Sequence, residues 1–477
     1  MTAAALTGVP ALWDALTSEV TAGRRFAGLF GTPRPEGLLL SAHLAGDDGV
    51  RTLEAVLPAG AASYPALTPR LGAAFWYERE IHDVFGVVPA GHPRLAPLIL
   101  PPDEHAAPRH VTGHGMFTIP HGPVRSGVFE SIEYLVETPG EDIPHVSLRV
   151  FYKHRGIEKR FGQLTAADGV LLAERAEGIA SVAHALAYCH AIERIAGVSA
   201  PWPAALVRVL HAELERIANH LDVAARLADA AGLAVATARF GWHKERALRL
   251  VSRLCGSRFG RGVVVPGGVS ALPLLGPAGI LDELSQAEKA ITADATALMG
   301  TASFLDRLRR TGPLRPGRAR EHGALGPVGK GSGFTDDARG ARPYDAYSAL
   351  GLPPARPHTG GDALARLRVR WDEVRQSFQL LRQATGELGE AAAAGPLRAD
   401  LTETHGLTGR AVGWAEAPQG EVLYDAATEA GRITRCRPRS ASFHNLVLFH
   451  EVFAGDILTD FPFIEASFGL SVAGVAL

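Results

Sequence analysis

The chain has 477 residues, of which 47% are hydrophobic and 21% charged, and its formal net charge at pH 7 is -2. This balance is typical of a globular protein and excludes the disordered and fibrous classes. The length suffices for roughly two to four domains. A charge so close to zero gives no reason to expect nucleic acid or an anionic membrane surface as a partner.

Three cysteines, Cys189, Cys255 and Cys436, are too few and too widely spaced for a disulfide framework, which favours a reducing, cytoplasmic setting. No CxxC pair is present, and this argues against thiolate sites for zinc, iron–sulfur clusters or nickel. The N-terminal segment has no basic stretch and carries Asp14 among its apolar residues, so we do not expect a signal peptide. No run of about 18 uncharged apolar residues occurs, and any membrane association should therefore be peripheral.

The first part of the chain mixes a short helix with β-like stretches such as residues 37–41, and it ends in the aromatic and charged segment 75–86. A proline-rich stretch follows, and we place a linker near residues 100–115. Residues 128–152 have the pattern of strands, joined by a turn at residues 139–142.

The chain then becomes helical. Residues 167–196 are rich in alanine, and apolar residues three and four positions apart form a single stripe over residues 203–227. Further stripes cover residues 284–305 and 364–381, and short strand-like pieces return over residues 400–477. We therefore predict an α+β protein whose core is a helical bundle with β-rich attachments.

Residues 311–362, between the last two long helices, are rich in glycine, proline and arginine. A structureless connection of this length is uncommon, so we expect the segment either to be functional or to wrap over a partner. Within it, residues 326–332 resemble a phosphate-binding loop but carry Ala324 in place of the first glycine and Gly331 after Lys330. A flexible turn is the better interpretation.

The sequence does not support two other kinds of site, one for a nicotinamide cofactor and one for a metal ion. No GxGxxG motif lies in a βαβ context, so we do not expect the chain itself to bind a nicotinamide cofactor. Three histidines of the linker are expected to be solvated rather than metal ligands: His105, His110 and His114. Four more on helices are expected to be hydrogen-bonded interior residues: His184, His190, His211 and His220.

Several motifs carry a family resemblance. Residues 78–80 (Glu-Arg-Glu), 83–86 (Asp-Val-Phe-Gly) and His92 resemble the signature of the 30-kDa subunit of respiratory complex I, although Ala96 stands where Lys, Arg or Pro is expected. Residues 152–159 (YKHRGIEK) resemble the HRGxEK segment of the 49-kDa subunit and of group 4 nickel–iron hydrogenase large subunits.

Further matches to these families follow in order at residues 174–175, 183–188, 213–221, 266–269, 337–344, 416–418 and 442–446. The fused order also resembles the large subunit of formate hydrogenlyase. The resemblance implies a 30-kDa-subunit-like α+β domain over residues 1–105. It implies a 49-kDa or hydrogenase-large-subunit-like helical domain over residues 106–477.

The residues argue against hydrogenase chemistry. A nickel–iron centre needs four thiolates, and the resemblance places its first cysteine pair at Glu177 and Ala180 and its second at Ser471 and Gly474. The hydrogenase arginine that follows Ala-Pro is Gln419 here. We therefore expect no nickel and no hydrogenase activity.

Quinone chemistry is the second activity that the resemblance offers. The histidine and tyrosine that bind the quinone headgroup in complex I correspond to Ser126 and Gly178, and a histidine near the terminal iron–sulfur cluster corresponds to Gly260. Hydrogen-bond donors at such positions would stabilise the charge that reduction puts on quinone oxygens. All three departures weaken the transfer of this chemistry.

Three charged candidates remain. Arg175 matches the arginine that complex I sets against its terminal cluster; the alternative is a salt bridge with Glu174 or Glu177. Glu158 matches a proton-relay acid of hydrogenases; the alternative is an ion-pair or helix-start carboxylate. Glu177 would carry protons if buried, and would be inert on a solvated helix face.

The resemblance thus implies a catalytic group of Ser126, Glu158, Arg175 and Glu177. Four further residues would line the cofactor or quinone cavity: His154, Arg155, Gly178 and His184. The alternative for His154 and Arg155 is that they brace the fold. The chain would be a peripheral subunit on the cytoplasmic side of the cell membrane, in an oxidoreductase of the NADH dehydrogenase type. Its partners would be a small iron–sulfur subunit similar to the 20-kDa subunit, a ferredoxin-like subunit and membrane-embedded subunits. The alternative is a non-catalytic scaffold that couples the electron-transfer arm to the membrane arm.

Overall fold

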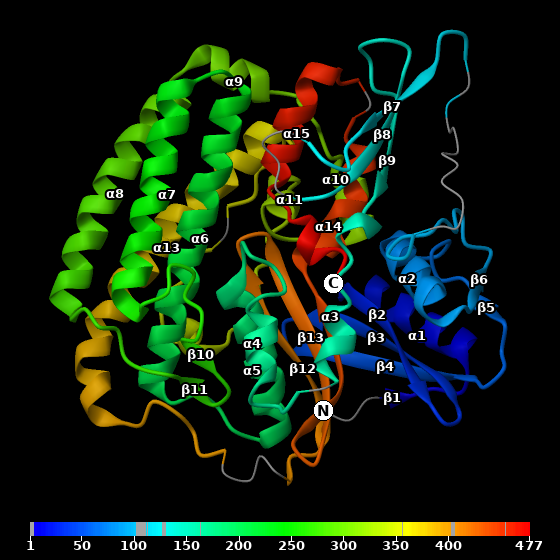
Figure 1. The fold of residues 1–477 in the computed structure, drawn as a ribbon, viewed down its shortest axis with the longest axis horizontal. Coiled ribbons are helices and arrows are strands. Elements are labelled where there is room, and N and C mark those ends of the chain that lie inside the picture. Colours follow the sequence, from blue (N-terminus) through cyan, green and yellow to red (C-terminus); the bar gives the residue numbers. More distant parts are fainter. Residues whose placement is uncertain are drawn as a thin grey trace.

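The computed structural model describes residues 4–101, 111, 113–125, 130–162, 164–354, 356–401, 406–453 and 455–477. A β-rich N-terminal unit is followed by a bundle of long helices and a second large sheet (Figure 1). The prediction of an α+β fold is therefore confirmed. Among the described residues, no helix combines the length and apolarity that a membrane span requires.

The N-terminal unit is built on a four-stranded sheet in the order β1-β4-β3-β2. The sheet and the helices beside it comprise β1 (Ala4–Ala5), α1 (Val9–Thr21), β2 (Arg25–Arg34), β3 (Gly37–Gly46), β4 (Gly49–Pro58) and α2 (Phe75–Phe85). The other elements of this unit are β5 (Ser63–Pro65), η1 (Gly72–Ala74) and β6 (Val88–Ala90). Nearly every residue of β3 is buried, because α1 packs on the sheet and the rest of the molecule covers it as well.

Acidic residues of α2 hold the segments around the helix. The buried carboxylate of Glu78 accepts hydrogen bonds from the backbone N–H groups of Leu67 and Thr68, at 2.7 and 2.8 Å. Asp83 does the same for Leu98 and Ile99, at 2.7 and 2.9 Å. These two acids of the 30-kDa-like motif therefore have a structural role, since each satisfies backbone donors of an irregular segment.

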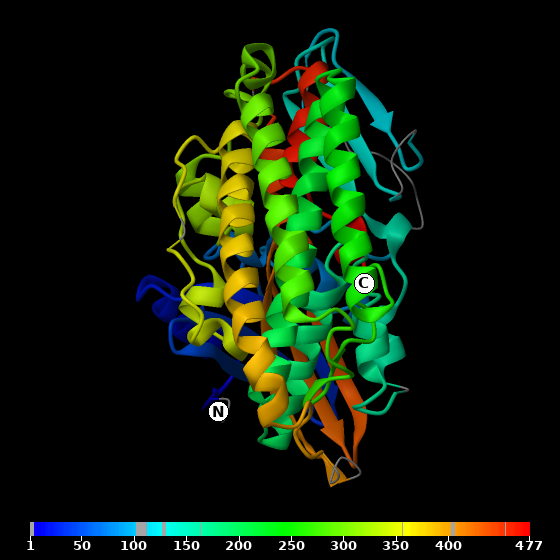
Figure 2. The same ribbon diagram turned by 90° about the vertical axis from the view of Figure 1, so that its left-hand side faces the viewer.

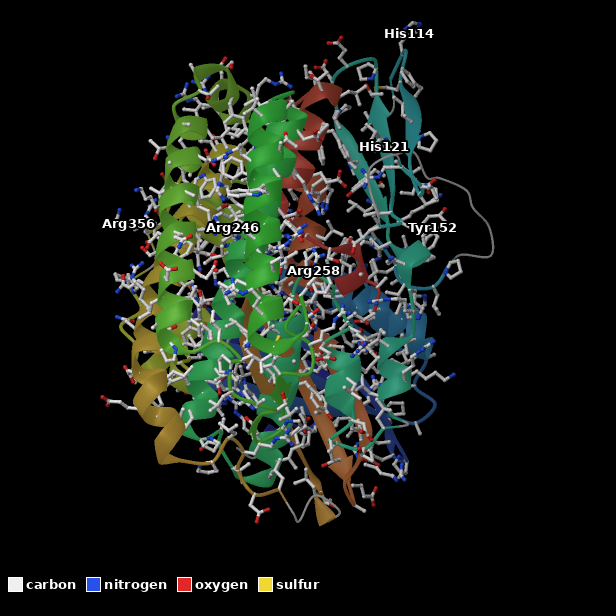
Figure 3. The ribbon with its side chains drawn as sticks, turned by 60° about the vertical axis from the view of Figure 1, so that its left-hand side comes forward. His114, His121, Tyr152, Arg246, Arg258 and Arg356 are labelled. Atoms are coloured by element: carbon white, nitrogen blue, oxygen red, sulfur yellow. The ribbon has the colours of Figure 1, made fainter. Side chains whose placement is uncertain are left out.

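A three-stranded antiparallel sheet follows, and the pattern over residues 128–152 predicted its second and third strands but not its first. Its strands are β7 (Phe117–His121), β8 (Glu133–Thr138) and β9 (His145–Arg149). His121 lies among these strands in Figure 3. The strands lead into η2 (Phe151–Lys153) and α3 (Ile157–Phe161).

The bundle consists of long helices that run side by side, as Figure 2 shows for α7, α8 and α13. The helices are α5 (Ser181–Ala196), α6 (Trp202–Ala230), α7 (Ala234–Cys255), α8 (Pro277–Met299) and α13 (Ala363–Ala394). The predicted apolar stripes are buried between them. One correction concerns Leu305, which lies on a separate helix, α9 (Ala302–Leu308), because the chain turns at Gly300.

The helix predicted over residues 167–196 is interrupted. It divides into α4 (Gly169–Ala173) and α5, with a non-helical turn between them. Tertiary hydrogen bonds hold this turn: the Glu215 carboxylate accepts from the N–H of Val182, the second residue of α5, at 2.7 Å. The Glu174 carboxylate likewise accepts from the N–H of Gly262 at 2.7 Å.

Residues 311–362 are ordered where they are described. They contain α10 (Pro316–His322), α11 (Gly326–Gly331), α12 (Ala338–Ala341) and η3 (Asp345–Ser348). All six residues of α11 are buried, so the flexible turn expected there is wrong. Gly326 has φ +52°, and a Cβ on it would lie 2.3 Å from the carbonyl oxygen of Gln419. Only glycine permits this approach of two backbones.

The C-terminal part forms a second three-stranded sheet, β12 (Gly409–Ala417), β13 (Gly420–Glu429) and β14 (Arg432–Arg439). Helix α5 packs against it, and a Cβ on Gly413 would lie only 2.1 Å from the carbonyl oxygen of Ala187. The remaining elements are short: β10 (Val264–Val265), β11 (Gly268–Val269), α14 (Ala441–Leu446), η5 (Val447–Glu451), η6 (Leu458–Asp460), α15 (Phe461–Phe468) and η7 (Val472–Gly474).

Candidate functional site

The structure brings together the two segments in which the resemblance places the hydrogenase cysteines. Glu177 lies in the turn between α4 and α5, and Gly474 ends η7. A Cβ on Gly474 would lie 2.6 Å from the Glu177 carboxylate. No side chain larger than hydrogen therefore fits at position 474 without displacing Glu177.

Glu177 is buried, with a side chain that is 1% exposed. One of its carboxylate oxygens lies 3.0 Å from Nε2 of His184, and the other accepts a hydrogen bond from the Ser442 hydroxyl at 2.7 Å. His184 is oriented in turn by the Tyr424 hydroxyl, 2.8 Å from its Nδ1. The solvated-face alternative for Glu177 is therefore wrong, and the carboxylate forms part of an interior hydrogen-bonded cluster.

Ser471 joins the same cluster from the C-terminal side. Its backbone N–H donates to the Ser442 hydroxyl at 3.1 Å, and its own hydroxyl donates to Glu130 at 2.6 Å. The described residues here offer carboxylates and hydroxyls in place of thiolates, and they fill the space around Gly474. These residues do not fit a nickel–iron centre, whose metals require soft sulfur ligands. In the described part of the chain, no group of three or more His, Cys, Asp or Glu side chains is arranged to hold a metal ion.

Arg155 clamps the two segments to each other. Its guanidinium donates to the carbonyl oxygen of Ala473 at 2.7 Å on one side, and to those of Arg175 and Ala176 on the other. Burial lowers the pKa of Arg155, although Glu130 and Glu177 lie nearby and oppose the shift. His154 lies at the surface, and the partial burial of its ring lowers its pKa. Arg155 braces this region, one of the two roles that we expected for it.

Glu158 and Arg175 are each ion-paired, which is the alternative that we gave for both residues. Glu158, in the first turn of α3, pairs with Arg437, which also pairs with Glu80 at 2.9 Å. Arg175 pairs with Glu174, and its side chain is 51% exposed. Neither residue reaches the Glu177 cluster through a described contact. Ser126 lies outside the described residues.

A cavity of about 100 Å³ opens beside Gly178. It lies between the turn before α5, helices α6 and α7, and the loop that carries Gly260; Arg258, on the same loop, is labelled in Figure 3. The two glycines are the positions at which the resemblance expects a tyrosine and a histidine. The walls are mostly apolar and include Ile179, Val182, Leu214, Leu248 and Val251.

The polar side chains that α6 contributes to this cavity include His211, Glu215 and Asn219. Burial raises the pKa of Glu215 to about 8 and lowers that of His211 to about 4. Among the described residues, Nδ1 of His211 and Oδ1 of Asn219 have no hydrogen-bond partner. The cavity thus combines apolar walls with a protonated acid and polar atoms that remain to be satisfied.

Glu215 and Asn219 were not predicted from the sequence, although a signal was present. Positions 211, 215 and 219 are spaced by four residues, which places three polar groups on one face of an otherwise apolar helix. His211 was expected to be hydrogen-bonded, and its unpartnered Nδ1 contradicts that expectation. The same expectation is confirmed for His184 and His190, whose two ring nitrogens both have partners. His220 is bonded through Nε2 to Glu373, but its Nδ1 has no partner among the described residues.

Comparison with known proteins agrees with this architecture. Residues 32–111 match the family model of the respiratory-chain NADH dehydrogenase 30-kDa subunit, and residues 229–405 match that of the 49-kDa subunit. The chain is 28% identical to formate hydrogenlyase subunit 5 of Escherichia coli over 87% of this chain and 77% of the relative. It is 29% identical to the carbon monoxide-induced hydrogenase of Rhodospirillum rubrum over 74% of this chain and 96% of the relative. It is 25% identical to the C/D subunit of the NADH-quinone oxidoreductase of Rhodopseudomonas palustris over 83% of this chain and 72% of the relative. The chain therefore carries the 30-kDa and 49-kDa domains of complex I fused in one polypeptide, and its relatives include both NADH-quinone oxidoreductase C/D subunits and hydrogenase subunits.

Proposed function

We propose that this chain is a peripheral subunit of a membrane-bound oxidoreductase complex related to complex I and formate hydrogenlyase. In this role it conducts electrons from an iron–sulfur partner subunit towards a quinone or another acceptor, without a nickel–iron centre. One observation carries the proposal. The four positions at which the resemblance places the nickel–iron cysteines are Glu177, Ala180, Ser471 and Gly474, and Glu177 and Ser471 lie in one hydrogen-bonded cluster.

The cavity beside Gly178 supports the presence of an acceptor site. Reduction of a quinone puts negative charge on its oxygens, and a nearby acid that holds a proton stabilises this charge. Glu215 meets that requirement, because its pKa of about 8 keeps the carboxyl group protonated at neutral pH. The apolar walls would accept the ring of the acceptor. The side chains that act on the acceptor would then be those of α6 rather than Glu158 or Ser126.

The relatives support the proposal that the chain has partner subunits. Formate hydrogenlyase, the membrane-bound hydrogenase of Pyrococcus furiosus and NADH-quinone oxidoreductase are named as assemblies of several subunits. A small iron–sulfur subunit would dock near the half-exposed Arg175, and ferredoxin-like and membrane-embedded subunits would complete the complex on the cytoplasmic side of the membrane.

A scaffold without catalysis is the second candidate. It is favoured by the close packing at Gly474 and by the Arg155 clamp, which together leave little room for a reactant next to Glu177. In a scaffold the cluster stabilises the position of the C-terminal segment, and any electron transfer takes place in the partner subunits.

The test uses the tagged chain, purified with its native partners from detergent-solubilised membranes. Reduction of a quinone analogue by a low-potential donor is compared between the wild type and Glu215→Gln, Glu177→Gln and Arg175→Ala. If Glu215 supplies the proton, Glu215→Gln lowers the rate by about 100-fold, while the exposed Glu390→Gln leaves it unchanged. If the complex assembles and none of these changes alters its rate of quinone reduction, the scaffold is the remaining candidate. Elemental analysis of the same preparation is expected to find no nickel.

The pH dependence gives an independent check. A group that must be protonated to act loses activity as the pH rises through its pKa, which for Glu215 is about 8. The wild-type rate is therefore expected to fall above pH 8, and the residual rate of Glu215→Gln is expected to lack this step. A fall at the same pH in both proteins would assign it to another group.

A further inference from the structure

A network of charged side chains is buried where α6, α11, α12, α13 and β12 meet, outside both the Glu177 cluster and the cavity. Its cationic members are Arg216, Lys330 and Arg339, and its acidic members are Glu213, Asp337, Glu373 and Glu416. None of the seven side chains is solvated, so their charges must be balanced within the network.

Three of the four acids are paired with cations. Lys330 donates to Asp337 at 2.6 Å and to Glu373 at 2.7 Å. Arg339 lies 2.8 Å from Asp337 and 3.1 Å from Glu213. Glu213 also accepts hydrogen bonds from Arg216, Tyr347 and Ser377. Three cations and three carboxylates are thus matched. Burial opposes ionisation of these acids, but the neighbouring cations hold the pKa values of Glu213, Asp337 and Glu373 below their ordinary values.

Glu416 is the fourth acid, and it has no cation of its own. In the described part of the chain, its carboxyl group accepts a hydrogen bond from the backbone N–H of Ala338 at 3.0 Å and forms no ion pair. Arg216 bonds the carbonyl oxygens of Glu416 and Ala417 instead of the carboxyl group. A negative charge on Glu416 would therefore be in excess within a region that excludes water.

The charged groups that face Glu416 favour the neutral, protonated form of its carboxyl group. Burial and the nearby Asp337 carboxylate raise the pKa of Glu416 to about 8, and Lys330 and Arg216 only partly oppose this rise. His220, on the far side of Glu373, offers no additional cation, because burial lowers its pKa to about 4. The Tyr344 hydroxyl, which accepts from the N–H of Glu416, is also neutral, because burial raises its pKa.

We propose that Glu416 is a proton-storage site: its carboxyl group holds one exchangeable proton, which completes the charge balance of the buried network. The inference rests on the geometry of the network and is independent of the proposed function. When the proton leaves to a base in solvent, the product is a fourth carboxylate that faces Asp337, and like charges in a dry interior repel strongly.

The location of Glu416 indicates which part of the molecule would respond to loss of the proton. Ala338, whose N–H contacts Glu416, begins α12, and the hairpin after Glu416 packs backbone against backbone on Gly326 of α11. Loss of the proton is therefore expected to loosen α11 and α12 from β12. The proton would act as a lock between the short helices and the C-terminal sheet.

Infrared spectroscopy of the purified full-length chain tests the storage site, because the C=O stretch of a protonated carboxylic acid is resolved from carboxylate bands. The wild type minus Glu416→Gln difference spectrum at neutral pH is expected to contain one such band. Titration of the wild type is expected to remove this band with a midpoint near pH 8. Glu215→Gln is the matched control, since it removes a different acid of similar pKa and leaves the Glu416 band in place.

Hydrogen exchange followed by mass spectrometry tests the lock. At a pH one unit above the midpoint, peptides from residues 326–342 of the wild type are expected to exchange several-fold faster than those of Glu416→Gln, which stays neutral. Absence of the band from the wild type minus Glu416→Gln difference spectrum at neutral pH would overturn the proposal. If Glu416→Gln does not fold, titration of Glu215→Gln decides: Glu215 no longer contributes there, so a protonated-acid band that disappears near pH 8 is expected from Glu416, and its absence would overturn the proposal.

Discussion

At the scale of single residues, the packing around Gly474 leaves no space for the side chain of a cysteine at that position. Position 474 is glycine, and the carboxylate of Glu177 fills the volume in front of it. The carboxylate is held there by His184 and Ser442. The identities of residues 177 and 474 are therefore coupled by packing, and neither can be changed independently of the other.

Gly474→Ala is expected to lower the free energy of unfolding by about 1–3 kcal/mol, because the new methyl group overlaps the Glu177 carboxylate. Thermal or urea denaturation measures this change. In the Glu177→Ala background the cost should shrink, since the colliding group is gone. Gly386→Ala on α13 is the matched control: nothing lies within 4 Å of its Cβ position, and alanine favours the helix by up to about 1 kcal/mol. Equal costs of Gly474→Ala in both backgrounds would contradict the coupling.

The sequence could predict a site residue only where its contacts are local in the chain or where a motif resembles that of a known family. The motifs identified Glu177, Ser471 and Gly474 as neighbours by resemblance, and the structure brings their segments together. The partners of Glu177 are 7 and 265 residues away in the chain, and no local pattern specifies them. The spacing of His211, Glu215 and Asn219 was readable from the sequence, but the loop that closes the cavity over them was not.

At the scale of elements, periodicity predicted the long helices, because each buries one apolar stripe against its neighbours. It failed where tertiary hydrogen bonds override propensity, as at the turn between α4 and α5. It failed again at α11, whose glycine-rich sequence is typical of a loop. What makes α11 an ordered helix is its tertiary environment, namely the ion pairs of Lys330 and the close backbone contact at Gly326.

Lys330→Met should therefore destabilise the protein by about 3–5 kcal/mol, since it removes the buried cation that Asp337 and Glu373 share and leaves Asp337 with Arg339 alone. Lys244→Met removes the pair with Asp222 on the half-exposed side of α7, and we expect a loss of no more than about 1 kcal/mol. Chemical denaturation of both variants measures the difference. Similar losses would show that α11 is held by something other than its ion pairs.

At the scale of the whole molecule, the N-terminal unit is fastened to the C-terminal sheet by buried charge. Figure 1 shows it beside β13. Glu421 on that strand is contacted by Arg25 of β2 at 2.8 Å, by Arg342 at 2.9 Å and by Arg439 at 2.7 Å. The two family modules are thus joined by more than the chain between them. No sequence pattern indicates this contact, because the partners lie up to 396 residues apart.

Removing the charge of Glu421 is expected to uncouple the two units. Burial opposes its ionisation, but the three arginines hold its pKa well below the ordinary value of 4.5. An acid whose pKa is lowered by folding stabilises the protein at all pH values above its ordinary pKa, and this contribution is lost only as the pH falls below it. Glu421→Gln should therefore cost about 3–5 kcal/mol at neutral pH and leave three buried guanidinium groups without their shared carboxylate.

Differential scanning calorimetry of this variant at neutral pH is expected to show two transitions where the wild type shows one, with the N-terminal unit melting first. Acidification of the wild type to below pH 4.5 should begin to produce the same separation, because the stability that the ionised Glu421 contributes is progressively lost there. The exposed Glu429→Gln, on the same strand, should retain the single transition. A single transition in Glu421→Gln at an unchanged temperature would mean that apolar packing, rather than this charge cluster, couples the two units.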